Sequence, residues 1–476
     1  MNPTPSTADS AESPIEKVFA RVNYERRAIE DGTEFRLDTI RLILRRLGDP
    51  HLQLNVVHIA GTKGKGSTAH FVARIGSEWG LKTAIYSSPH FERYTERFVV
   101  DNCEVSADVL NPILSKVLAV VEELDQEIQK GLIDLRPATF FDISTATAFL
   151  LFAEQGVELV ALEVGLGGRL DSTNVCQSMA TIVTSISLDH TRQLGSNTTQ
   201  IAAEKAAIIK SKVPAVSGRV DESVFGVIQK QAQKVGADLT RMDHQFGLVP
   251  DSLRTHGVEI FFDYFDSLTG DTIPELKIQT LGEHQVHNAC LAVAAILRIA
   301  PQLRSGQFNF RSDVDVAIRR GLAHTELQGR LELVGRQPYI VADMAHNEAS
   351  IDAMIKSLKN LSVSGETQAI FSCSRDKDHF AMLRAMAEFF DRIILTTFEN
   401  NPRSQSLEVL NRDARMMTES DVDNLSTEWI AIPSPKSAFE HARNLATGEG
   451  LIVFCGSIFL VGELLPIAKK TLPLHE

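Results

Sequence analysis

The chain has 476 residues, of which 61 are acidic and 48 basic, giving a formal net charge of −13. This length predicts two domains rather than one compact core, and the 43% hydrophobic and 23% charged content is ordinary for a globular protein. The acidic balance argues against DNA or RNA as a partner, although a local loop can still bind a small anionic ligand.

The N-terminal segment 1–14 is polar and rich in Ser, Thr and Pro. It has no basic stretch followed by an apolar core, so we expect a disordered tail rather than a secretion signal. The five cysteines are scattered and include no C-x-x-C pair, which favours free thiols in a reducing cytoplasm over disulfides or a zinc site. No run of 18 apolar residues occurs, so no membrane span is expected.

Strands and helices alternate over residues 15–300, which predicts a first domain with a mostly parallel sheet and helices on both faces. The expected helices are 15–47, 105–130, 144–154, 198–211 and 285–299. The expected strands are 56–60, 82–86, 159–164, 180–186 and 213–216. Short alternating segments over 246–279 predict a small antiparallel sheet attached to this domain.

Polar stretches over 301–329 predict an interdomain linker, and a second alternation over 330–476 predicts a smaller, Rossmann-like α/β domain. Its expected strands are 339–342, 368–371, 392–396 and 451–454, and its expected helices include 351–361, 380–390 and 438–446. The fold class is therefore α/β: a phosphate-loop ATPase domain with a mostly parallel sheet and a small antiparallel sheet, followed by a smaller α/β domain.

A glycine-rich loop directly follows the strand expected at 56–60, and a helical pattern follows the loop. This order typically holds nucleotide phosphates, because glycines let backbone N–H groups approach the phosphate oxygens. Lys65 can neutralise charge on the outer phosphates, and the hydroxyl of Ser67 or Thr68 can lie near a magnesium ion. The loop is shorter than the standard G-x-x-x-x-G-K-[ST] and has an extra glycine after the lysine. The alternative is a simple turn, but the flanking strand and helix favour nucleotide binding.

Glu163 ends another apolar strand, directly before the glycine-rich segment 165–171. Ligands of open α/β sheets bind beyond the carboxyl ends of the strands, so Glu163 is well placed to hold a metal bound to phosphate. The alternative is a strand-end carboxylate paired with a nearby Lys or Arg. The neighbouring phosphate loop favours the metal.

Three further polar segments leave alternatives open. Ser88 follows a strand and either lies in a plain turn or supplies a hydroxyl to Mg²⁺, which prefers oxygen ligands. His190 also follows a strand, and is either a metal ligand or a hydrogen-bonded structural histidine. Lys205, next to Glu204 on the following helix, would by composition alone belong to a solvated helix face.

In the second half, Arg330 lies near the expected domain crossing, and Asp343 and His346 follow a strand. These side chains either make structural ion pairs or contact the phosphates and ribose of a nucleotide.

Together these segments resemble the folylpolyglutamate synthase and dihydrofolate synthase family, within the Mur ligase superfamily. The family's phosphate-loop pattern H-[VI]-A-G-T-N-G-K-G-S matches residues 58–67, with Lys63 in place of the usual Asn. The order and spacing of the motifs hold over residues 15–465. The other matching motifs are 86–90, 93–97, 162–174, 187–191, 203–206, 281–288, 329–332, 345–347, 376–378, 401–403 and 456–457.

The resemblance implies a role for each matching residue. The residues at the ATP phosphates would be Thr62, Lys63, Gly64, Lys65, Gly66 and Ser67. Further nucleotide contacts would come from Asn288, Arg330 and Asp343. Two Mg²⁺ ions would be held by Ser88, Glu163, His190 and a carbamylated Lys205. The pterin-bearing substrate would lie against Phe140, Phe141, Arg169 and Asp171, and the amino-acid substrate near His346 and Ser457. The catalytic residues would be Lys65, Lys205 and His346.

Three positions depart from the family pattern. Lys63 adds positive charge beside the phosphates. Asp142 stands near a position where Glu is common, in the segment expected to contact the pterin. Gln328 replaces a frequent Pro before Gly329.

The implied reaction is ATP-dependent amide formation by a cytoplasmic, monomeric ligase without nucleic-acid or membrane partners. L-Glutamate would be added to dihydropteroate, or to the glutamate tail of folates, through an acyl phosphate. One alternative is a related ligase that adds amino acids to cell-wall precursors. Another is a nucleotide-dependent switch that forms no amide.

Overall fold

The computed structural model describes residues 13–24, 36–303, 310–399, 401–419 and 426–471. The chain forms two compact units. The first comprises Met1–His90, Tyr94–Met242 and Ala295–Phe310, and the second comprises Phe91–Arg93, Asp243–Ala294 and Arg311–Glu476. Of the tail expected over 1–14, residues 1–12 lie outside the described residues, and Ser13 caps the first helix.

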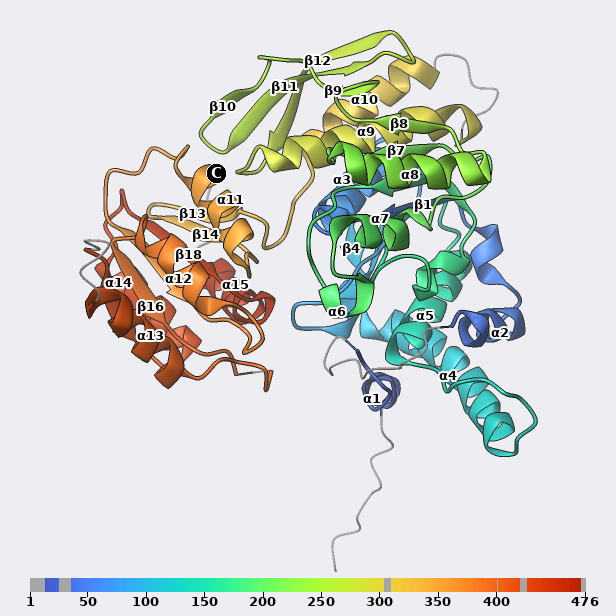
Figure 1. Cartoon of the computed structure of the whole chain (residues 1–476), viewed down its shortest axis with the longest axis horizontal. Coiled ribbons are helices and arrows are strands. Elements are labelled where there is room, and N and C mark those ends of the chain that lie inside the picture. The colour runs from blue at the N-terminus through green and yellow to red at the C-terminus, as the bar shows by residue number, and fades with distance from the viewer. Residues whose placement is uncertain (1–12, 25–35, 304–309, 400, 420–425, 472–476) are drawn as a thin grey trace, which may run out of the picture. The chain divides into compact units, whose positions relative to one another are not determined.

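The first unit is built on an eight-stranded sheet with the order β4-β3-β2-β5-β1-β6-β7-β8 (Figure 1). Its strands are β1 (Val56–Ala60), β2 (Thr83–Tyr86), β3 (Phe98–Val100), β4 (Cys103–Glu104), β5 (Leu159–Glu163), β6 (Ser178–Val183), β7 (Ala215–Ser217) and β8 (Leu239–Arg241). The six strands β2, β5, β1, β6, β7 and β8 pair in parallel in this order. At one edge, β3 pairs antiparallel with both β2 and β4. The predicted, mostly parallel sheet is confirmed.

The helices and 3-10 turns of this unit cover both faces of the sheet. They are α1 (Pro14–Phe19), α2 (Asp38–Arg46), η1 (Pro50–Gln53), α3 (Lys65–Glu78), η2 (Tyr94–Arg97), α4 (Ala107–Gln129), α5 (Phe140–Glu154), η3 (Ser172–Val175), α6 (Thr191–Leu194), α7 (Thr198–Ala206) and α8 (Glu222–Val235). Val56 and Val160 belong to a buried cluster with residues of α4 and α5. Leu159, on the opposite face of the sheet, packs against Gly76 of α3.

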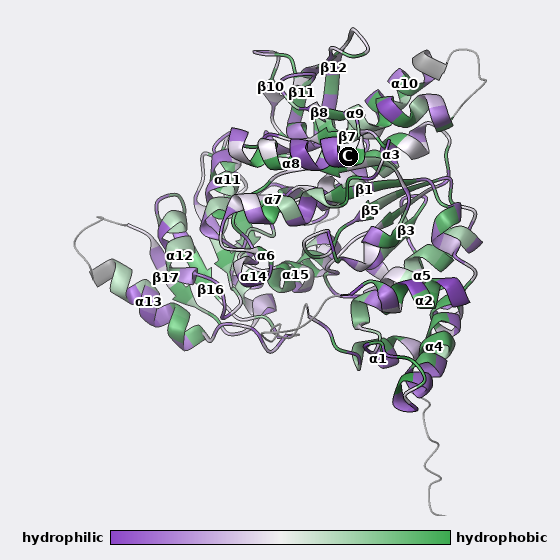
Figure 2. Ribbon diagram, turned by 45° about the vertical axis from the view of Figure 1, so that its right-hand side comes forward, coloured by the Kyte–Doolittle hydropathy of each residue, from purple (hydrophilic) through white to green (hydrophobic). Residues whose placement is uncertain are grey.

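The hydrophobic strands explain why this sheet is buried on both faces. β1 and β5 have the sequences VVHIA and LVALE, and every residue in both strands is buried. In Figure 2 these central strands are mostly green, the colour of hydrophobic residues. Parallel strands covered on both faces carry continuous apolar runs of this kind, and their polar loops then collect at the carboxyl ends.

The second unit contains two sheets. The smaller one is wholly antiparallel. Its strand β11 (Glu259–Asp266) pairs with each of the other three, which are β9 (Phe246–Leu248), β10 (Arg254–His256) and β12 (Asp271–Gln279). The larger has the order β13-β14-β18-β15-β16-β17 and is parallel except for β13. The sequence predicts that the small sheet attaches to the first domain, whereas residues 243–294 belong to the second compact unit.

The larger sheet comprises β13 (Glu332–Arg336), β14 (Tyr339–Ala342), β15 (Thr367–Phe371), β16 (Arg392–Leu395), β17 (Glu428–Ala431) and β18 (Leu451–Cys455). The later helices are α9 (His284–Leu303), α10 (Phe310–Ala323), α11 (Glu348–Leu358), α12 (His379–Ala387), α13 (Leu407–Glu419), α14 (Pro435–Leu445) and α15 (Ile458–Thr471). The predicted Rossmann-like α/β domain is confirmed, and α10 occupies much of the expected linker.

One helix in the described part of the chain, α9, has the length and apolar composition of a membrane-spanning segment, but 67% of its apolar window is buried. A core helix of a soluble protein has the same properties, so α9 is weak evidence for a span.

Candidate active site

The phosphate loop, residues 61–67, joins β1 to α3 at the carboxyl edge of the sheet. Gly64 is the N-cap residue of α3 and has a φ of 85°, which favours glycine. A Cβ at Gly61 would lie 1.8 Å from Thr184 Oγ1, so only glycine allows this close packing. The loop therefore presents the N-terminus of a 14-residue helix, where unpaired N–H groups and the helix dipole favour a bound phosphate.

The segment after β6 holds the phosphate loop from one side. Thr184 Oγ1 and Ser185 Oγ donate to the Lys63 carbonyl at 2.6 and 3.0 Å. The Thr62 N–H donates to the Ser185 carbonyl at 2.7 Å, and the Ser187 N–H donates to Thr62 Oγ1 at 3.1 Å. The sequence analysis missed these supporting residues, although their position after a buried strand was a usable signal.

Lys65 and Glu163 lie together beside the loop. Lys65 Nζ is 3.8 Å from Glu163 Oε1, and both side chains are largely buried. The strand-end carboxylate thus has the lysine neighbour that the alternative interpretation required, yet both groups stand at the phosphate loop. Ser67 Oγ and Thr68 Oγ1 are fully buried and have no hydrogen-bond partner among the described residues. A carboxylate and two such hydroxyls are oxygen donors that fit phosphate-bound Mg²⁺.

Lys205 is buried, so the solvated-face interpretation is wrong. Its side chain is 5% exposed, and its Nζ donates to the Gly61 carbonyl at 2.9 Å. Burial, and then the charge of Lys65, lower the pKa of the Lys205 ammonium to about 7. Lys205 therefore joins α7 to the phosphate loop, a proximity that sequence composition did not predict.

Ser88 and His190, two of the residues expected at the magnesium ions, also lie in the first unit. Ser88 is half-buried and precedes Pro89 through a cis peptide bond. His190 has a φ of 47° and an exposed side chain, and its N–H donates to Asp189 Oδ1 at 2.9 Å. The described residues contain no cluster of three or more His, Cys, Asp or Glu suited to a metal. The predicted magnesium set has only two residues of these types and stays a prediction.

Of the residues expected at the pterin substrate, Arg169 and Asp171 lie in the glycine turn, residues 165–171, and Phe141 packs against it. A Cβ on Gly165 would lie 2.4 Å from the Phe141 ring, so turn and ring pack closely. Phe140 is fully buried. Arg169 is exposed and donates from Nε to Glu204 Oε1 at 2.9 Å. Asp171 Oδ2 accepts from the Leu166 N–H inside the turn at 2.9 Å, and Oδ1 accepts from the Thr173 N–H of η3 at 3.0 Å.

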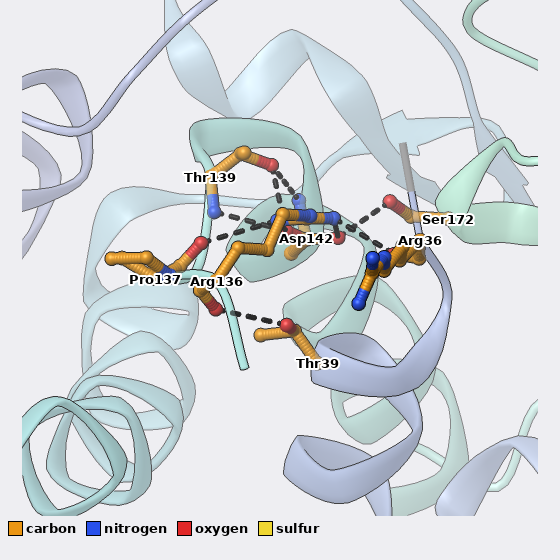
Figure 3. Close-up of polar contacts among 7 residues, drawn as sticks. All are labelled: Arg36, Thr39, Arg136, Pro137, Thr139, Asp142 and Ser172. Atoms are coloured by element: carbon orange, nitrogen blue, oxygen red, sulfur yellow. Dashed lines mark hydrogen bonds and ion pairs between the residues drawn. The ribbon is translucent and has the colours of Figure 1, made fainter. Parts of the chain in front are cut away.

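Asp142 has a structural role at the start of α5 (Figure 3). It is fully buried and accepts hydrogen bonds from Arg136 Nη1 at 2.6 Å, Thr139 Oγ1 at 2.8 Å and Ser172 Oγ at 2.8 Å. The Thr139 N–H also donates to Asp142, which completes a capping box. This departure from the family pattern therefore has a local structural reason.

In the second unit, the Asp343 carboxylate binds a backbone N–H group next to Arg330. Asp343 Oδ2 accepts from the Leu331 N–H and Oδ1 from the Ala345 N–H, both at 2.8 Å. The Met344 N–H donates to the Gly329 carbonyl at 2.9 Å. Asp343 therefore fixes the backbone around Arg330, whose side chain is half-buried.

His346, Ser457 and Asn288 also lie in the second unit. His346 Nδ1 donates to the Met344 carbonyl at 2.9 Å, because a carbonyl can only accept. Ser457 is buried just before α15, and its Oγ accepts from the Phe459 N–H at 3.2 Å. Asn288 Nδ2 donates to Gln285 Oε1 at 2.9 Å. The roles predicted for these three residues stay predictions.

Comparison with protein families gives two matches. The Mur ligase middle domain matches residues 59–296, and the Mur ligase, glutamate ligase domain matches residues 329–458. The dihydrofolate synthase/folylpolyglutamate synthase of Bacillus subtilis (strain 168) is 28% identical over 434 residues, covering 91% of this chain and 95% of the relative. The protein of the same name from Escherichia coli (strain K12) is 30% identical over 431 residues, covering 90% of each.

Solved structures give the same result. Mycobacterium tuberculosis folylpolyglutamate synthase complexed with ADP and AMPPCP has a TM-score of 0.80 and 27% identity, covering 91% of this chain and 95% of that one. E. coli FolC in complex with DHPP and ADP has a TM-score of 0.78 and 27% identity, covering 98% and 100%. With both Mur ligase domains present and the E. coli relative matched along nearly its whole length, the chain belongs to the folylpolyglutamate synthase/dihydrofolate synthase family of Mur ligases.

Proposed function

We propose that this protein is an ATP-dependent ligase that adds L-glutamate to dihydropteroate and to the glutamate tail of folates. The observation that carries the proposal is the phosphate loop at the N-terminus of α3, with Lys65 3.8 Å from the buried carboxylate of Glu163. Similarity over most of the chain to proteins named dihydrofolate synthase/folylpolyglutamate synthase supports the substrate class.

The chemistry requires activation of a carboxylate. An amine does not displace the oxygen of a free carboxylate at a useful rate, so the γ-phosphoryl group of ATP is first transferred to the substrate carboxylate. The α-amine of L-glutamate then attacks the acyl phosphate, and phosphate leaves as the amide forms. The backbone N–H groups of the phosphate loop and the ammonium of Lys65 stabilise the charge on the phosphoryl group during transfer.

Magnesium would be held near Glu163, with Ser67 or Thr68 supplying a hydroxyl and Ser88, His190 and Lys205 completing the predicted set. When bound, Mg²⁺ offsets phosphate charge and aligns the triphosphate. A lysine with a pKa near 7 is partly uncharged at neutral pH, which suits reaction of Lys205 with carbon dioxide. A carbamate there would replace a cation by an anionic oxygen ligand.

The remaining roles are those that the matching motif positions of the family imply. Phe140, Phe141, Arg169 and Asp171 would bind the pteroyl substrate, Asn288, Arg330 and Asp343 the nucleotide, and His346 and Ser457 the incoming glutamate. We place the domain division at residues 15–300 and 330–476, with 301–329 between them, and propose a cytoplasmic monomer.

The decisive experiment supplies ATP, Mg²⁺ and L-glutamate with either dihydropteroate or tetrahydrofolate, and identifies products by mass. We expect one added glutamate per turnover, and phosphate release only when both glutamate and the pteroyl substrate are present. ATP hydrolysis with neither substrate, and no new amide, would support a nucleotide switch instead. Products formed only on a muramyl precursor would support a cell-wall ligase.

A further inference from the structure

His58 lies inside β1, the strand that leads into the phosphate loop, and no role has been assigned to it above. Its side chain is fully buried, and its Nε2 is 2.9 Å from Thr173 Oγ1. Thr173 belongs to η3, the 3-10 turn directly after the glycine turn. A polar ring in the middle of an apolar parallel strand is unfavourable unless it makes a specific hydrogen bond.

The direction of this hydrogen bond follows from the next contact. Thr173 donates both its N–H, at 3.0 Å, and its hydroxyl to Asp171 Oδ1. A threonine hydroxyl has one hydrogen, so once that hydrogen points to the carboxylate, the oxygen can only accept from His58. The ring must therefore carry its proton on Nε2.

The environment of the ring keeps it in this form. Burial, followed by the charge of Lys210, lowers the pKa of His58 to about 3, so the imidazole is neutral at physiological pH. Nδ1 is buried without a hydrogen-bond partner in the described part of the chain. An unprotonated nitrogen is the less costly group to leave there, because an N–H would need an acceptor.

A second contact fixes the same turn from the other side. Asn174 Nδ2 donates to the Arg169 carbonyl at 3.0 Å. Lys210 Nζ in turn donates to the Asn174 carbonyl at 2.9 Å and to its Oδ1 at 2.6 Å. The 3-10 turn η3 thus holds the glycine turn at Asp171 and at Arg169, while His58 and Lys210 hold η3.

The glycine turn has two other neighbours that matter for the reaction. Gly165 packs against the ring of Phe141, and the Arg169 N–H donates to the Glu204 carbonyl, next to Lys205. A change in the shape of this turn would displace Phe141 and Arg169, two of the residues proposed to bind the pteroyl substrate.

We propose that His58 is a positioning residue for the pteroyl-binding side of the site. Its Nε2–H donates to the Thr173 hydroxyl, which donates to Asp171 and so fixes the C-terminal end of the glycine turn. The inference rests on the proposed function, because it assumes that this turn faces the pteroyl substrate.

The test compares four variants of the full chain. His58→Leu and Thr173→Val each remove one link, whereas His58→Gln keeps an N–H donor and Thr173→Ser keeps the hydroxyl. We expect the first two to raise the KM for the pteroyl substrate about tenfold, which corresponds to about 1.4 kcal/mol of lost binding free energy. The KM values for ATP and glutamate should change by less than about twofold, and the two conservative variants should recover most of the pteroyl affinity.

The matched control is His51→Gln. His51 is another buried histidine of the first unit, with a lowered pKa due to burial and an Nδ1 that also has no partner among the described residues. It lies in η1, where its ring is 5.8 Å from the ring of Phe149 in α5, so we expect its loss to leave all three KM values unchanged. An equal rise of all KM values in His58→Leu, or a rise of the pteroyl KM in His51→Gln, would overturn the inference.

A spectroscopic measurement decides the question if the apolar variants fail to fold. In protein labelled with ¹⁵N-histidine, the signal lost in His58→Gln should show a protonated Nε2 and an unprotonated Nδ1, and it should not titrate down to about pH 5. A protonated Nδ1 would contradict the hydrogen-bond chain. Wild-type protein that forms no glutamate amide would contradict the proposed function alone, because the tautomer measurement does not depend on turnover.

Discussion

At the scale of single residues, Lys65 is the side chain on which the proposed phosphoryl transfer would depend most directly. It is the first residue of α3 and lies beside the buried Glu163 carboxylate. We expect Lys65→Ala to reduce the rate of amide formation by at least about 100-fold, because a charge that stabilises the transferring phosphoryl group is removed. The measurement is product mass per unit time. Lys116→Ala is the control and should keep full activity, because Lys116 is an exposed lysine of α4 that pairs with Glu154 at the end of α5.

His58 gives a residue-scale prediction for stability against pH. Its pKa is about 3 in the folded chain and about 6.5 when unfolded. Between these values the unfolded state binds the extra proton, so the folded state gains stability as pH rises through this window and loses it as pH falls. From about pH 6 to about pH 5, the wild type should lose about 1.2 kcal/mol more free energy of unfolding than His58→Gln.

Urea denaturation of the wild type and His58→Gln at these two pH values measures that difference. The other histidines titrate equally in both proteins and cancel in the comparison. Parallel pH dependence in the two proteins would mean that His58 is not buried in its neutral form.

At the scale of secondary-structure elements, the start of α5 depends on Asp142. Its carboxylate satisfies the Arg136 guanidinium, the Thr139 N–H and two hydroxyls in a buried site (Figure 3). We expect Asp142→Ala to lower the free energy of unfolding by about 3 kcal/mol, because several donors, one of them charged, lose their acceptor. Thermal or urea denaturation measures the loss. Asp108→Ala, in the exposed first turn of α4, should change stability by less than about 1 kcal/mol.

The same helix shows what sequence patterns could and could not predict. The sequence analysis predicts a helix from Ser144, whereas α5 begins at Phe140. Thr139 and Asp142 have the spacing of a capping box, which is the sequence signal for that start. The single helix expected over 15–47 is interrupted after α1, and β13, with a glycine and a register shift, was missed. Boundaries depend on caps and bulges, which periodicity does not record.

For the site, the sequence predicted the phosphate loop and Glu163, because both stand at carboxyl ends of strands in a parallel sheet. It did not predict that Thr184 and Ser185 hold the loop or that Lys205 is buried against the Gly61 carbonyl. Those contacts join segments more than 120 residues apart, so they follow from packing rather than from local pattern.

At the scale of the whole molecule, nucleotide binding should raise the free energy of unfolding. A ligand that binds only the folded state raises the free energy of unfolding in proportion to the logarithm of its concentration over Kd. With Mg²⁺ and a non-hydrolysable ATP analogue at about 100 times Kd, we expect a gain of about 2.7 kcal/mol and a higher Tm. Lys65→Ala should lose most of this gain at the same concentration, because the ammonium no longer offsets triphosphate charge.

Differential scanning fluorimetry with increasing analogue concentration measures the effect, and Lys116→Ala again serves as the control. Adding EDTA should reduce the gain in the wild type if a divalent cation accompanies the triphosphate. We expect the stabilisation to arise at the phosphate loop, because the N-terminus of α3 at Gly64 favours a bound phosphate. A Tm that rises equally in the wild type and Lys65→Ala would place the nucleotide away from this loop, and the proposed roles of Glu163, Ser67 and Lys205 would then fail together.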